Sequence, residues 1–186
     1  MSLLTHPAQA GQLNRLCAWT LLVLSVLTLL WSVFQLAGAM ALEAWDARQW
    51  LASHNLVGNG LFGWLMVHAV SLSALQLASC LPCIGIGIGM LGGRNWARQG
   101  FIVLLLLTAV LNLAALPLLD RLFVDLLLSV SSGLPDGDGL DLLAELRDTR
   151  IMLWVTSLLP LLALSAIHVW LARRFNKPDM RQLYQV

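Results

Sequence analysis

The fold is indicated first by residues 16–42, LCAWTLLVLSVLTLLWSVFQLAGAMAL, a stretch without Lys, Arg, Asp or Glu. An α-helix needs about 20 apolar residues to cross the ~30 Å hydrocarbon core of a bilayer. Three further apolar stretches follow, at residues 61–91, 101–119 and 151–172. A soluble helix that is apolar all round would need a far larger protein around it. We therefore predict an all-α integral membrane protein, an antiparallel four-transmembrane-helix bundle.

The composition agrees with a single transmembrane domain over residues 1–186. Of these residues 59% are hydrophobic and 11% are charged, and the mean hydropathy is +0.78. Four spans and their connections use nearly the whole chain. We expect the lipid bilayer as the main environment and no nucleic acid among the partners.

The charged residues are distributed unequally between the two sides of the spans. The N-terminal segment, the loop at 92–100 and the C-terminal tail carry seven basic residues and one acid, whereas the two other connections carry four basic residues and nine acids. Lys and Arg concentrate on the cytoplasmic side of membrane proteins. We therefore predict a protein integral to the bacterial inner (cytoplasmic) membrane, with both termini cytoplasmic.

The connection at 120–150 is the only sizeable predicted segment outside the spans. Apolar residues recur at helical spacing over 119–130 and again over 140–146, and a run rich in Gly and Asp separates them. We predict an outer amphipathic helical hairpin lying over the mouth of the bundle. Its acids would attract a basic partner. They are Asp120, Asp125, Asp136, Asp138, Asp141, Glu145 and Asp148.

Polar and small side chains form matched stripes along the first two spans. Small residues let helix backbones approach, and hydroxyl or amide groups hydrogen-bond across the contact. We predict a helix-packing seam, since an unpaired amide in lipid is unfavourable. Its residues are Ser25, Thr28, Ser32, Gln35, Ser73, Gln76, Cys80, Cys83 and Gly87. The alternative interpretation is the polar lining of a conduit or substrate cavity.

Cys80-Leu-Pro-Cys83 is the one motif that indicates chemistry. Two thiols at this spacing form a dithiol redox centre or half of a soft-metal site. Here they lie inside an apolar span, where hydrocarbon disfavours the thiolate. We expect structural thiols, with no metal, no cofactor and no catalytic residue; thiol-linked metal transport and redox catalysis are the alternatives.

Three functional hypotheses remain, and we favour the first. Two contact surfaces without a catalytic constellation indicate a non-enzymatic inner-membrane protein that binds another membrane or periplasmic protein. It would be an accessory subunit of a membrane complex or an immunity protein against a membrane-targeting toxin. The second hypothesis is a small transporter or channel, either as a homo-oligomer, which we expect because four helices enclose little space, or through the polar seam between the first two spans. The third is a membrane thiol-redox enzyme that uses Cys80 and Cys83.

Overall fold

The computed structural model describes residues 7–46, 49, 53, 60–131 and 138–184, with the backbone at most for residues 7, 8, 62 and 126–148. The elements assigned within these ranges are all α-helices. They are α1 (Pro7–Ala44), α3 (Leu61–Val67), α4 (Ala69–Leu91), α5 (Asn95–Ser131), α6 (Asp138–Phe175) and α7 (Pro178–Gln182). Four of them, α1, α4, α5 and α6, are long and apolar enough to cross a membrane. The predicted all-α class with four long apolar helices is therefore confirmed.

Helix is the expected conformation for these segments, because hydrocarbon offers no partner to an exposed backbone amide or carbonyl. The helices α4, α5 and α6 each continue through an internal proline, Pro82, Pro117 and Pro160. The turn between α4 and α5 is tight. Gly93 takes a φ of 66° there, a left-handed conformation that glycine adopts without strain, and the amide of Arg94 donates to the Gly89 carbonyl at 2.9 Å.

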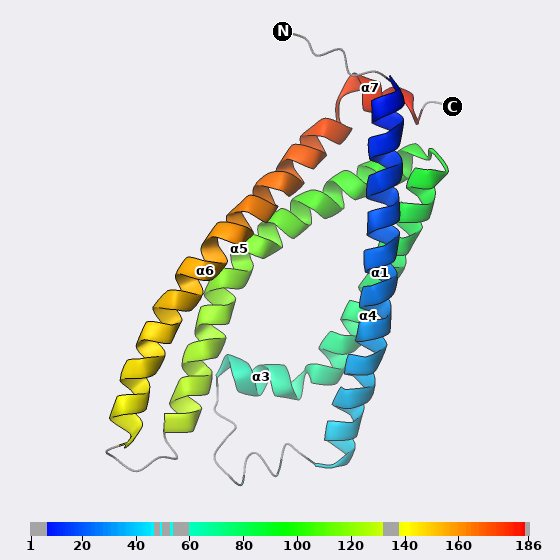
Figure 1. Ribbon diagram of the computed structural model, residues 1–186. Helices are drawn as coiled ribbons and strands as arrows, with labels where there is room; N and C mark the ends of the chain where they lie inside the picture. The colour runs from blue at the N-terminus through cyan, green and yellow to red at the C-terminus, as the bar shows by residue number, and fades with distance from the viewer. Residues whose placement is uncertain (1–6, 47–48, 50–52, 54–59, 132–137, 185–186) are drawn as a thin grey trace.

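The long helices are arranged as two pairs. Helix α1 packs along α4, and α5 packs along α6, whereas α4 and α5 share a smaller contact. Figure 1 shows that the pairs meet at the end where α7 lies and diverge toward the other end. Helix α3 crosses the space between the diverging ends, from α4 toward α5 (Figure 1). A closed bundle around one common core is therefore not confirmed.

Several helix boundaries differ from those predicted. The second span begins at Ala69 rather than near residue 61, because the helical conformation breaks at His68, which has φ −104° and ψ 12°. The outer segment also differs. Residues 120–131 continue α5 and residues 138–150 begin α6, so these parts extend the long helices instead of lying over the molecule as a separate hairpin. Neither part contains a proline, so every residue there has a backbone amide for the helical hydrogen bonds.

The buried core lies at the end where the two pairs meet. It joins residues of α1, α4, α5, α6 and α7: Ala10, Ala18, Met90, Ala97, Phe101, Leu105, Ala172, Phe175 and Met180. The rings of Phe101 and Phe175 meet edge to face, with their centroids 4.9 Å apart. The start of α1 and helix α7 lie at this same end (Figure 1). The core therefore holds the two helix pairs together at one end of the molecule.

Candidate functional site

The contact between α1 and α4 contains the most deeply buried residues of the predicted seam. Ser25, Ser32, Cys80 and Gly87 are all buried, and Ser32 is fully inaccessible. A Cβ atom at Gly87 would lie 2.7 Å from Cγ of Leu22 on α1. A side chain at this position would therefore require the Leu22 side chain to shift, so α1 and α4 pack closely here.

The other seam residues are less enclosed. Ser73, Gln76 and Cys83 are half-buried. Thr28 is exposed, and its hydroxyl donates to the Leu24 carbonyl of its own helix at 2.8 Å, which satisfies it without a neighbouring helix. Gln35 is half-buried, and its Oε1 atom is buried without a hydrogen-bond partner among the described residues. The structure therefore brings most of the stripe toward the contact, with Thr28 turned away from it.

The cysteines are free thiols. The Cys80 Sγ atom donates to the Gln76 carbonyl of its own helix at 3.4 Å, a weak contact typical of a packed thiol. Among the residues that the structure describes, no three His, Cys, Asp or Glu side chains are grouped so that they could hold a metal ion. The structural role of Cys80 and Cys83, like the redox and metal alternatives, stays a prediction.

Two of the seven outer acids take part in internal contacts. Asp120 of α5 accepts hydrogen bonds from Arg150 of α6 at 2.5 and 2.6 Å and from the Trp154 indole at 2.9 Å. Asp125 accepts the Leu61 amide at 2.5 Å and thereby links α5 to the start of α3. These two carboxylates hold helices of the chain itself, so they are less available to a basic partner than the sequence alone indicates.

The remaining outer acids lie outside the residues described in full. Asp136 is not described, and for Asp138, Asp141, Glu145 and Asp148 only the helical backbone is described. Their proposed contribution to a partner surface stays a prediction.

A polar cluster at the end where the helix pairs meet was missed by sequence reasoning. The Asn14 amide donates to the Met90 carbonyl at 3.2 Å, and its Oδ1 atom accepts the Tyr184 hydroxyl. Nearby, the buried Arg98 donates to the Phe175 carbonyl, the last of α6, at 3.1 Å. These contacts join residues that are far apart in the chain, so no local pattern could have indicated them.

Tyr184 is kept neutral by its burial at this end of the molecule. Burial of the phenol raises its pKa to about 12, although the positive charge of Arg98 acts in the opposite direction. The ordinary value is about 10. Tyr184 is therefore a neutral hydrogen-bond donor over the whole physiological range.

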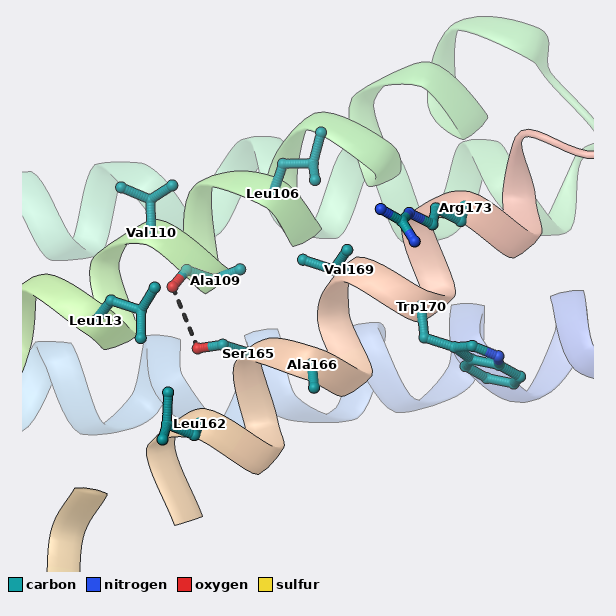
Figure 2. A pocket seen from close by; sticks show the side chains of 10 residues that line it. All are labelled: Leu106, Ala109, Val110, Leu113, Leu162, Ser165, Ala166, Val169, Trp170 and Arg173. Atoms are coloured by element: carbon teal, nitrogen blue, oxygen red, sulfur yellow. Dashed lines mark hydrogen bonds between the residues drawn. The ribbon is translucent and has the colours of Figure 1, made fainter. Parts of the chain in front are cut away.

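A groove of about 580 Å³ lies between α5 and α6 and was also not predicted. Figure 2 shows it with Leu113 and Leu162 at one end and Trp170 and Arg173 at the other. Its lining residues are Leu106, Ala109, Val110, Leu113, Leu162, Ser165, Ala166, Val169, Trp170 and Arg173. The groove is therefore apolar along most of its length and has the cationic Arg173 at one end.

Comparison of the chain with protein-family models, with curated proteins and with solved structures found no match.

Proposed function

We propose that the chain is a non-enzymatic protein of the bacterial inner membrane that binds another membrane protein, as an accessory subunit of a membrane complex. The observation that carries this proposal is how little of each span is buried. The buried share of the most apolar stretch is 17% in α1, 22% in α4, 17% in α5 and 6% in α6. In a self-contained bundle each helix buries a stripe against its neighbours. Here most residues of each span are not buried within the chain, and lipid or another protein must cover them.

The outer half of α1 has the surface features of a helix-binding face. Phe34, Gly38 and Ala41 are exposed and recur at four- and three-residue spacing, which places them on one side of the helix. Phe34 is 71% exposed, and a Cβ atom at Gly38 would meet nothing within 4 Å. Small residues allow another helix to approach closely within a membrane. We assign this α1 face (Phe34, Gly38 and Ala41) to the partner.

Orientation in the membrane forms part of the same proposal. We infer that both termini and the loop at 92–100 are cytoplasmic, and that the helices of each pair run antiparallel. Asn14 near the start of α1 bonds to Met90 near the end of α4, and Arg98 near the start of α5 bonds to Phe175 at the end of α6. These pairings support antiparallel neighbours, and the gathering of basic residues at that end supports a cytoplasmic location.

The accessory-subunit version is favoured over the immunity version because of the outer acids. A toxin arriving from outside would be attracted by an acidic surface, but Asp120 and Asp125 are engaged within the chain. An intramembrane face does not depend on these charges.

Purification from native membranes with two matched glycine variants tests the proposal. Gly38→Leu fills the α1 face, whereas Gly11→Leu adds the same side chain at the other end of α1, also with nothing within 4 Å. We expect a stoichiometric membrane protein to co-purify with the wild type and with Gly11→Leu, and to be lost with Gly38→Leu. Recovery of the wild-type protein without any co-purifying partner, after mild solubilisation and crosslinking, would contradict the proposal.

A further inference from the structure

We propose that the groove between α5 and α6 binds an anionic phospholipid, with an acyl chain along the groove and the headgroup phosphate at Arg173. The groove, of about 580 Å³, has a volume typical of small-ligand sites. Its most deeply buried lining residues are Ala109 and Ser165, whose small side chains leave the hollow between the larger Leu and Val side chains (Figure 2). This site is independent of the protein partner, which we place on α1.

The interior of the groove suits a hydrocarbon chain. Ser165 is the only hydroxyl among the lining residues, and its Oγ atom donates to the Ala109 carbonyl at 3.3 Å. The two polar groups therefore satisfy each other. A polar ligand would have no partner along this wall and would lose its hydration there.

The length of the groove matches one leaflet of the bilayer. At 1.5 Å per residue, Leu162 and Arg173 are about 16 Å apart along α6, and half of a ~30 Å hydrocarbon core is about 15 Å. Arg173 lies two residues before the end of α6 at Phe175, so it belongs at the membrane boundary. An acyl chain that begins there would end near the middle of the bilayer.

The charge at the end of the groove selects an anion. Arg173 is exposed and has no ion pair or side-chain hydrogen bond within the described ranges, whereas its neighbour Arg174 pairs with Asp179 at 2.6 Å. A guanidinium group binds phosphate oxygens with two parallel hydrogen bonds. Trp170 lies beside it in the lining, and indoles are enriched at the depth of lipid headgroups. Arg173 is therefore placed to hold the phosphate of a lipid whose chain fills the groove.

Native mass spectrometry of the full chain in detergent tests this site with phosphatidylglycerol and phosphatidylcholine of identical acyl chains. We expect the wild type to retain phosphatidylglycerol preferentially, because the choline cation of phosphatidylcholine offsets its phosphate charge. Arg173→Gln should weaken phosphatidylglycerol binding about fivefold and phosphatidylcholine binding by less, so that the preference is lost. Arg173→Lys should keep most of the preference. Arg94→Gln is the matched control, since Arg94 is exposed at the same end but does not line the groove.

A groove-filling variant tests the position of the acyl chain. Ala166 is exposed, so Ala166→Phe should leave the fold intact, which thermal unfolding in detergent checks. The same variant should weaken the binding of both lipids, because the phenyl ring occupies the space of the acyl chain. Inorganic phosphate should not compete with the lipid, because the acyl chain anchors the lipid in the groove. Unchanged lipid binding in Ala166→Phe, or an equal loss in Arg94→Gln and Arg173→Gln, would overturn the site. A change of oligomeric state in Ala166→Phe with lipid binding intact would assign the groove to a second copy of the chain and equally overturn it.

Discussion

At the scale of single residues, Tyr184 reports most directly on the polar cluster that joins the chain ends. It is the only tyrosine in the sequence, so tyrosinate absorbance in the near ultraviolet follows this group alone. Because burial raises its pKa to about 12, the absorbance step should come well above pH 10. A step near the ordinary value of about 10 would mean that the phenol is exposed to water.

The raised pKa of Tyr184 makes the stability of the folded protein depend on pH. A group whose pKa is raised on folding contributes stability that is complete below its unfolded pKa and is lost as the pH rises toward its folded pKa. Thermal stability in detergent should therefore fall between about pH 10 and pH 12. Tyr184→Phe should be less stable at neutral pH by about 0.5–1.5 kcal/mol, because the hydrogen bond to Asn14 is lost, and should lack this alkaline step.

Arg98 shows what the sequence could and could not indicate at this scale. The charge asymmetry counted Arg98 as a cation of the predicted loop at 92–100. In the structure it lies in α5, and its buried guanidinium donates to the last carbonyl of α6 and to the Asn95 side chain. The seam residues were predicted because small and polar side chains repeat along a helix. Arg98, Asn14 and Tyr184 carry no such pattern, since each meets a partner on a distant segment.

At the scale of elements, the contact between α1 and α4 can be tested with two glycines of the same helix. Gly87→Ala should destabilise the protein by about 1–3 kcal/mol, because the new Cβ atom would meet Leu22 at 2.7 Å. Gly85→Ala adds the same atom where nothing lies within 4 Å, and should be neutral or slightly stabilising through its higher helix propensity. Thermal unfolding in detergent measures both, and equal effects would contradict the close approach at Gly87.

The helices themselves were predictable because long apolar runs permit few other conformations in a membrane. The break in the helix at His68 was not predictable, since the same apolar run continues on both sides of this residue. Asp125 accepts the Leu61 amide at the start of α3, and this contact between distant segments was not visible in the local pattern. The extension of α5 and α6 beyond the predicted spans was missed for a different reason. Charged residues were taken as the end of each helix, although a helix ends where its hydrogen-bond pattern ends.

At the scale of the whole molecule, the inferred orientation can be tested by reporter fusions. Alkaline phosphatase is active outside the cytoplasm, and a fluorescent protein that matures only inside serves as its complement. We expect fluorescence and no phosphatase activity for fusions at residue 186 and in the loop at 92–100, because basic residues gather there. A fusion within 132–137 should give the opposite pattern. Phosphatase activity at residue 186 would contradict the orientation.

The open arrangement of the two helix pairs was the largest departure from expectation. Sequence patterns report how apolar a helix is, but they do not distinguish a surface that meets lipid from one that meets another protein, since both are apolar. The weakly buried spans therefore became visible only in three dimensions. They are the basis for assigning the protein's role to a contact with a partner.

Site-specific photo-crosslinking in intact cells tests this central claim most directly. A photoreactive residue at Phe34 or Ala41, both exposed on the α1 face, should give an adduct with one and the same membrane protein. The same probe at Leu22, which packs over Gly87 of α4, should give none with that protein. Adducts with lipid alone at Phe34 and Ala41, or with a second copy of the chain, would contradict the proposal that this protein acts by binding another membrane protein.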